Sequence, residues 1–227
     1  MITYINYAGS KIAYGDLPGA FDLQERGRAL AADLGEGRTS AWLQAERVSE
    51  HYWTGRWDEA VALANDVLTS PRESSLAYMA IPARLFRGHI RLDRGDAAGA
   101  QDDAERTLEQ ALEIGDFQVV VPARAFHARV LLAEARVEEA AASVSAALEL
   151  LPGREVWASY AWADLAIALE ACGLPFPETQ ASSRWIDAAR AFVSGDFAGA
   201  AECYAEIGSK PDEAHARERS AASLRSS

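Results

Sequence analysis

The chain has 227 residues and a formal net charge of −12, with a sequence pI of about 4.8. An acidic chain repels phosphates, so this balance argues against general nucleic-acid binding. No apolar run reaches the length of a membrane span, and the first residues lack the basic and apolar regions of a signal peptide, so we expect a cytoplasmic protein without membrane contact.

Almost the whole chain is predicted to be helical, because alanine-rich segments of helical length alternate with short breaks. Breaks are expected at 35–37 and 70–71, and the strongest, rich in Gly and Pro, at 173–177. The run Val119–Val121 is the only strand-like stretch, and Pro122 ends it. In chain order we expect helices at 3–14, 17–34, 40–54, 57–69, 74–94, 97–114, 117–134, 137–150, 155–171, 182–194, 197–207 and 211–224.

A short motif recurs at the turns between these helices. It begins with a small residue, continues with a polar one and has Ala five positions later, and its copies start at Gly15, Gly55, Gly95, Ala135 and Gly195. Four of the five copies are 40 residues apart, and a fixed period of this size indicates a stacked array of similar units. Glycine at the first position tolerates the left-handed conformation that ends a helix.

The residue after the glycine is expected to cap the following helix. Asp16, Asp96 and Asp196 hold this position in three copies, where a carboxylate meets free backbone N–H groups, while Arg56 and Arg136 lack such a cap. The expected tight crossing after the third copy involves residues that recur at helical spacing. They are Ala100, Ala104, Leu108 and Ala111.

A second repeat supports the same register. Pro82 and Pro122 each precede Ala and Arg and are again 40 residues apart, within the helices that lead into two of the turns. Because proline removes a backbone hydrogen bond, we expect these helices either to kink or to begin there.

This pattern resembles the tetratricopeptide-repeat family, whose unit is a helix–turn–helix of about 34 residues with small residues at fixed offsets. The family's small eighth residue falls on Ala8, Gly88, Ala128 and Ala188, its twentieth on Ala20, Ala60, Ala100, Ala140 and Ala200, and its late proline on Pro152. The resemblance implies an all-α helical-hairpin solenoid with a right-handed superhelix, as one array over 1–227. Its repeats would span about 1–36, 37–73, 74–115, 116–153, 154–194 and 195–227.

Units longer than the usual one are similar to the C-terminal arrays of large bacterial ATP-dependent LuxR-type regulators and ATPase-linked adenylate cyclases. The resemblance implies a non-enzymatic protein–protein interaction scaffold, the C-terminal regulatory region of a larger bacterial signalling or transcription regulator. The first helix has no polar capping helix before it, and repeat arrays need a polar face at each end. We therefore expect a homodimer or a contact with an upstream domain through Tyr4, Ile5 and Ile12.

One face of the first helices is rich in arginine. A helical wheel places Arg84, Arg87, Arg91 and Arg94 together, and steps of forty residues extend the face. In tetratricopeptide arrays the first helices line the concave surface, so the resemblance implies a basic groove for a protein or an acidic peptide. The candidate partner-binding residues are Tyr7, Arg47, Arg84, Arg87, Arg91, Arg94 and Arg124.

Two alternatives stand beside the groove. The arginines could instead pair with Asp and Glu of neighbouring helices, and the array could be a ligand-sensing effector domain that binds a small anionic metabolite or peptide in the concave groove. The outer helices are expected to be acidic, carrying Asp102, Glu105, Glu109 and Glu113.

No catalytic, metal or cofactor pattern emerges from the sequence. His51, His89, His127 and His215 have no helical metal-site spacing, and no phosphate loop or nucleophile elbow is present. Cys172 and Cys203 lie in apolar helical segments and are expected to pack as small hydrophobic side chains. We therefore expect neither an enzyme nor a bound cofactor.

Overall fold

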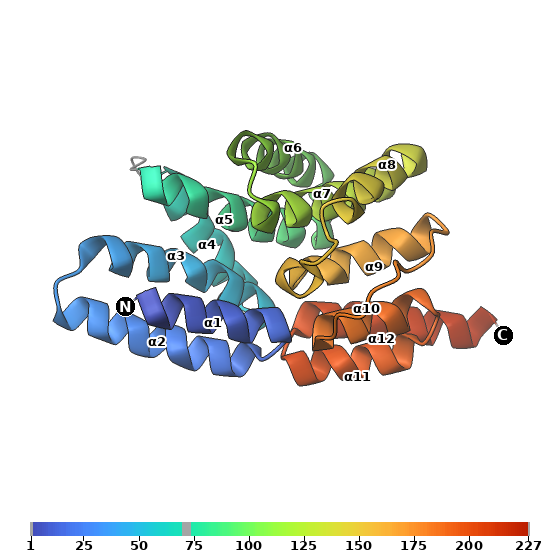
Figure 1. Cartoon of the computed structure of the whole chain (residues 1–227). Coiled ribbons are helices and arrows are strands. Elements are labelled where there is room, and N and C mark those ends of the chain that lie inside the picture. The colour runs from blue at the N-terminus through green and yellow to red at the C-terminus, as the bar shows by residue number, and fades with distance from the viewer. Residues whose placement is uncertain (1, 70–73, 227) are drawn as a thin grey trace.

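The computed structural model describes residues 2–69 and 74–226, and within these residues it forms twelve α-helices, one short 3-10 helix and no strand (Figure 1). The elements are α1 (Ile2–Tyr14), α2 (Leu17–Asp33), α3 (Gly37–Trp53), α4 (Trp57–Thr69), α5 (Ser74–Asp93), α6 (Ala97–Ile114), α7 (Phe117–Ala133), α8 (Val137–Leu148), η1 (Glu155–Ala158), α9 (Ala161–Ala171), α10 (Arg184–Val193), α11 (Phe197–Ile207) and α12 (Lys210–Ser226). The all-α prediction is confirmed for these residues. The expected break at 70–71 lies outside them.

The five predicted turns are all present, and all five use the left-handed conformation. Gly15, Gly55, Gly95 and Gly195 have φ between 77° and 85°, and Ala135 has φ 59° although it carries a side chain. Every copy ends one helix and starts the next two residues later. Ala135 therefore occupies a backbone position that the other copies fill with glycine, the residue that adopts it without steric cost.

The predicted caps also form. The carboxylates of Asp16, Asp96 and Asp196 each accept a hydrogen bond from the backbone N–H three residues later, at 2.9–3.0 Å. Arg136 provides no side-chain cap to α8, where Glu138 and Glu139 lie in the first turn instead. These contacts satisfy backbone donors that the first helical turn leaves free.

The helices pack in two layers (Figure 1). One layer holds the first helix of each pair, and the other holds the second helix. The first helices of successive pairs contact each other in the order α3, α5, α7, α9 and α10, while α4, α6, α8 and α11 each pack against the helix that precedes them. Tight crossings depend on alanine: Ala100, Ala104 and Ala111 of α6 have no exposed surface, and Leu108 is half-buried beside them. This confirms the predicted contact face of α6.

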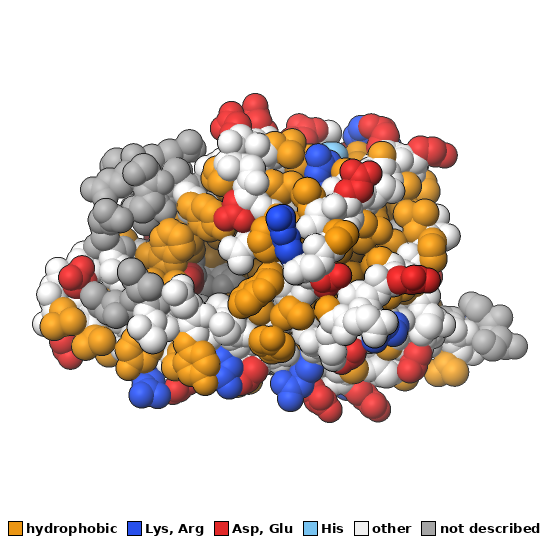
Figure 2. All heavy atoms as spheres, in the orientation of Figure 1, with side chains coloured by type: hydrophobic (Ala, Val, Ile, Leu, Met, Phe, Trp, Pro, Cys, Tyr) orange, Lys and Arg blue, Asp and Glu red, His pale blue; other side chains and the backbone are white. Residues whose placement is uncertain are grey.

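The outer surface is acidic where the sequence predicted it. Asp102, Glu105, Glu109 and Glu113 are all exposed on α6. Figure 2 shows acidic side chains gathered along the edge of the molecule over α6 and α8. None of the described helices combines the length and the apolar character that crossing a membrane requires.

The two ends of the array come together. Helix α1 contacts α10, and α12 contacts α3. The indole N–H of the fully buried Trp185 on α10 donates to the carbonyl of Ile12 at 2.7 Å, and Arg184 Nη1 donates to the carbonyl of Gly15 at 3.2 Å. The start of the chain and α10 are therefore joined by contacts between residues about 170 positions apart in the sequence.

Aromatic side chains fill the space inside this closure. The ring of Trp53 lies 5.1 Å from Phe86, 5.5 Å from Tyr160 and 6.3 Å from Trp185, so α3, α5, the segment before α9, and α10 meet at one indole. These rings belong to the main core, which extends from Leu17 to Ala216. The inner face of the array is thus largely a packed aromatic core.

One expected helix is corrected, and two other local expectations are tested. The helix expected at 155–171 is a 3-10 turn at Glu155–Ala158 and then α9, because Ser159 has φ 53° and breaks the helix. The strand-like run Val119–Val121 is buried inside α7, which confirms the helix expected at 117–134. Both α5 and α7 continue through Pro82 and Pro122, so neither helix begins at its proline.

The first helix is better covered than expected. Tyr4, Ile5 and Ile12 are half-buried, and Ile12 packs against the main core. The side chains of Tyr7 and Tyr14 remain exposed on α1, each at 55%. Association through this helix stays a prediction.

Candidate functional site

The predicted arginine stripe points toward the outer helices. Arg87 donates to Asp103 of α6 from Nε at 3.0 Å and from Nη2 at 2.5 Å, and its Nη1 donates to Asn65 of α4 at 2.6 Å. Arg91 donates to the same carboxylate at 2.9 Å, and the side chain of Asp103 has no exposed surface. The alternative of ion pairing with a neighbouring helix is therefore the arrangement seen for these two residues.

The other arginines of the stripe differ from one another. Arg84 is buried and donates to Gln110 at 2.9 Å, and Arg94 pairs with Asp58 at 2.7 Å on the surface. Arg47 and Arg124 form no ion pair with any described residue, and the Nε atom of each is buried without a hydrogen-bond partner. Tyr7 is exposed under the ammonium group of Lys11. The predicted residues thus do not share one open surface, and binding of an acidic partner to them stays a prediction.

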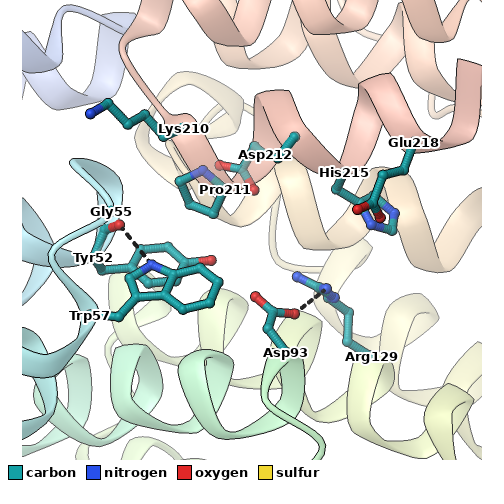
Figure 3. Close-up of a pocket in the computed structure, with 11 residues that line it drawn as sticks. Tyr52, Gly55, Trp57, Asp93, Arg129, Lys210, Pro211, Asp212, His215 and Glu218 are labelled. Atoms are coloured by element: carbon teal, nitrogen blue, oxygen red, sulfur yellow. Dashed lines mark hydrogen bonds and ion pairs between the residues drawn. The ribbon is translucent and has the colours of Figure 1, made fainter.

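The structure offers a different site at the other side of α5. A cavity of about 440 Å³ lies between the first half of α12 and the C-terminal ends of α3, α5 and α7 (Figure 3). Its size is within the range of small-molecule sites. The lining residues are Tyr52, Gly55, Trp57, Asp93, Arg129, Lys210, Pro211, Asp212, Ala214, His215 and Glu218.

A buried ionic network forms the floor of this cavity. Arg129 Nη1 of α7 donates to Asp164 of α9 at 3.1 Å, and its Nη2 lies 3.7 Å from Asp93 of α5. His89 Nε2 is 3.1 Å from the second oxygen of Asp164. The network connects three inner helices, and Figure 3 shows the guanidinium of Arg129 beside Asp93 at the cavity.

Burial and pairing act against each other in this network. Burial by itself would raise the pKa of Asp164, but His89 and Arg129 together hold it below its usual value. Burial disfavours the charge of Arg129, yet Asp164 and Asp93 raise the pKa of its guanidinium further above the ordinary value. Asp164 therefore stays ionised, and Arg129 stays cationic beside the cavity.

Helix α12 supplies the opposite wall. Asp212 is buried, and burial raises the pKa of its carboxyl group to about 6 although the hydroxyl of Ser209 donates to it. Burial lowers the pKa of His215 to about 4, so its ring is neutral at pH 7, and its Nε2 is buried without a partner. Lys210 and Glu218 are exposed at the cavity and form no ion pair with any described residue.

Two aromatic side chains form the third wall. The Trp57 indole N–H donates to the carbonyl of Tyr52 at 3.3 Å, and the two rings stack at 6.5 Å. In Figure 3 the hydroxyl of Tyr52 points toward Asp93 and the middle of the cavity. Flat apolar surface thus faces polar groups of both charge signs, which is the composition of a site for a small polar ligand.

The described residues contain no group of three or more His, Cys, Asp and Glu side chains that could hold a metal ion. Cys172 and Cys203 are unpaired, half-buried against the main core, and have thiol pKa values raised by burial. Their contact with apolar side chains agrees with their predicted packing role.

Sequence reasoning did not find this site. Its residues come from the ends of α3, α5 and α7, the start of α4 and one face of α12. The only local signal is that Trp57 and Asp93 each flank a predicted turn. Comparison with models of known protein families, with curated protein sequences and with solved structures finds no match for this chain.

Proposed function

We propose that this chain is a tetratricopeptide-like array that curls on itself and binds a small zwitterionic ligand in the cavity beneath α12. The proposal corresponds to the ligand-sensing alternative of the sequence analysis, with a different site and a ligand of both charges. It rests on one observation: Lys210 and Glu218 are unpaired charges of opposite sign at the rim of one cavity.

The charges of the walls favour such a ligand over a simple anion. Three carboxyl groups line the cavity, on Asp93, Asp212 and Glu218, against the two cations Arg129 and Lys210. Arg129 is already paired with two carboxylates, so Lys210 is the cation that remains for a ligand carboxylate. An ammonium group would be accepted by Glu218 or Asp212, and an apolar side chain would lie on Trp57. Free amino acids and short peptides have this chemistry.

Closure of the array favours a small ligand over an extended peptide. An extended peptide needs an open inner surface, and here the rings of Trp53, Phe86, Tyr160 and Trp185 occupy the inside. A ligand beneath α12 would bridge the last helix to α3, α5 and α7. Its binding would strengthen the closure, which is a means of passing a signal to the rest of a larger regulator.

The test is a thermal-shift screen with free amino acids, each compared with the amine that lacks its carboxylate and with the acid that lacks its amine. We expect the zwitterion to raise the melting temperature more than either analogue. Lys210→Met should remove the advantage over the amine, and Glu218→Gln the advantage over the acid.

Glu213→Gln provides the matched control, because Glu213 is on the same helix and pairs with Arg217 outside the cavity. It should leave the melting-temperature shift unchanged. Equal shifts by the zwitterion and both analogues, or no effect of either cavity variant, would contradict the proposal.

A further inference from the structure

A second cavity lies between α3 and α5. Its volume is about 150 Å³, and it is lined by the middle and last turns of α3, the middle of α5, single residues of α1 and α2, and Tyr160. A cavity of about 150 Å³ can hold a group of the size of benzene. Nothing in the proposed function uses this space.

The cavity contains a carboxylate in an otherwise apolar surrounding. Glu46 Oε1 accepts a hydrogen bond from the indole N–H of Trp42 at 2.9 Å, and Oε2 accepts one from Gln24 Nε2 at 3.0 Å. These two donors hold the carboxylate in one orientation. Ser49, which also lines the cavity, donates its hydroxyl to the backbone carbonyl of Glu46 at 2.7 Å and not to the carboxylate.

One acceptor in the cavity is left without a partner. Gln24 is 1% exposed, and its Oε1 has no hydrogen-bond partner. A buried carbonyl oxygen without a donor costs free energy, so it marks a place where a donor from outside the chain would be stabilising. Because the amide nitrogen of Gln24 is used by Glu46, the free atom is an acceptor, and the missing group is an N–H or O–H donor.

Aromatic rings form the walls around these acceptors. Trp42 and Tyr78 stack with their centroids 5.8 Å apart, and the rings of Trp53, Phe86 and Tyr160 also line the cavity. Ring faces attract cations and exclude water. Together with a carboxylate, they make a binding site that favours a positive charge over a neutral or negative one.

We propose that this second cavity binds a primary ammonium group attached to a flat apolar body, that is, a small aromatic amine. The ammonium group would donate to Glu46 and to Gln24 Oε1, and the body would lie among Trp53, Phe86 and Tyr160. Carboxylates and phosphates are excluded because Glu46 would repel them in a surrounding of low dielectric constant.

The protonation of Glu46 gives the site a pH dependence. Burial raises the pKa of Glu46 to about 7, and the hydrogen bonds from Trp42 and Gln24 and the charge of Arg28 on α2 only partly oppose it. The other titratable groups that line the cavity are Tyr78 and Tyr160, whose pKa values burial raises far above neutrality. Glu46 is therefore the group that changes charge between pH 6 and pH 8, and only its ionised form attracts an ammonium group.

The experiment measures binding of benzylammonium and of neutral benzyl alcohol to the full chain by isothermal titration calorimetry. At pH 8 the wild-type protein should bind benzylammonium more tightly than benzyl alcohol by about tenfold or more, as a charge-assisted hydrogen bond predicts. Glu46→Gln keeps the shape of the side chain and should abolish this preference, while binding of benzyl alcohol stays nearly unchanged. Glu213→Gln makes the same change outside both cavities and should leave both affinities as they are.

A second measurement needs no variant. Ionisation of a carboxyl group with a pKa of about 7 should raise the wild-type affinity for benzylammonium by about tenfold between pH 6 and pH 8, with no such change for benzyl alcohol. If circular dichroism shows that Glu46→Gln is unfolded, this comparison of pH values tests the proposal on the wild-type protein alone. The proposal is overturned if the two probes bind equally, if neither binds, or if Glu218→Gln removes benzylammonium binding while Glu46→Gln does not.

Discussion

Removing Arg87 tests whether the arginine stripe is part of the fold or a free surface. Arg87 and Arg91 donate three side-chain hydrogen bonds to the carboxylate of Asp103, which has no exposed surface. Arg87 provides two of them and is itself 14% exposed, while Arg91 is 30% exposed. Arg87→Ala would therefore leave one oxygen of a buried carboxylate without a donor.

The magnitude follows from what remains around Asp103. One donor from Arg91 still compensates part of the charge, so we expect Arg87→Ala to cost about 2–3 kcal/mol. Arg87→Ala with Arg91→Ala leaves the carboxylate uncompensated and should cost about 3–5 kcal/mol, the range for a broken buried pair. Arg106→Ala is the control. Its partner Asp102 and Arg106 itself are 50% and 64% exposed, so the loss should stay within about 0.5 kcal/mol.

Urea unfolding followed by far-ultraviolet circular dichroism measures these differences, provided that the slope of the transition is unchanged among the variants. If Arg87→Ala and the double variant were as stable as Arg106→Ala, Asp103 would not depend on these arginines. The stripe would then be a solvated surface, and the prediction of an acidic partner would be strengthened.

Three further variants test other parts of the fold. Ala135→Gly should raise the free energy of unfolding by about 0.5–1 kcal/mol, because Ala135 has φ 59° at a turn where the other copies have glycine; a loss of stability in urea unfolding would contradict this. Gly88→Ala should lower the free energy of unfolding by about 1–3 kcal/mol, because the added Cβ would lie 2.6 Å from Phe126 Cε1. Gly9→Ala is the control: its Cβ would meet nothing within 4 Å, so the change should be neutral or stabilising. Equal effects of the two variants on the melting temperature would refute the close packing at Gly88. Between about pH 4.5 and pH 7 the unfolded wild-type chain releases the Glu46 proton while the folded chain keeps it, so the wild type loses stability as pH rises. Glu46→Gln should therefore become more stable relative to the wild type over this range. A stability difference that does not change between pH 4.5 and pH 8 would show that folded Glu46 is not held protonated.

Local chemistry was enough to predict the helices and their turns. Apart from the segment at 155–171, the expected helix ends agree with the structure to within about three residues. The reason is that a left-handed residue such as Gly95 and a cap such as Asp96 act through backbone geometry within a few residues. The 40-residue period alone also predicts the turn at Ala135, although this copy of the motif has alanine where the others have glycine.

Departures from these local rules arise where burial decides the conformation. Nothing in the sequence near Ser159 signals a left-handed residue, but the break lets Tyr160 reach Trp53 and Phe86, and the indole of Trp162 donates to the carbonyl of Glu155. The run Val119–Val121 follows the helix expected at 117–134, because burial of α7 between its neighbours overrides the weak strand preference of valine.

The candidate binding surfaces could not be predicted from the sequence for a different reason. The helical wheel correctly grouped Arg87 with Arg91, but an angle around one helix axis does not say which neighbouring helix lies there, and the neighbour is α6 with Asp103. Closure through Trp185 and Ile12 joins residues 173 positions apart, and each cavity is lined by residues from several helices that are distant in the sequence. Such contacts are set by the sum of many packing interactions along the array, which no single stretch of the sequence contains.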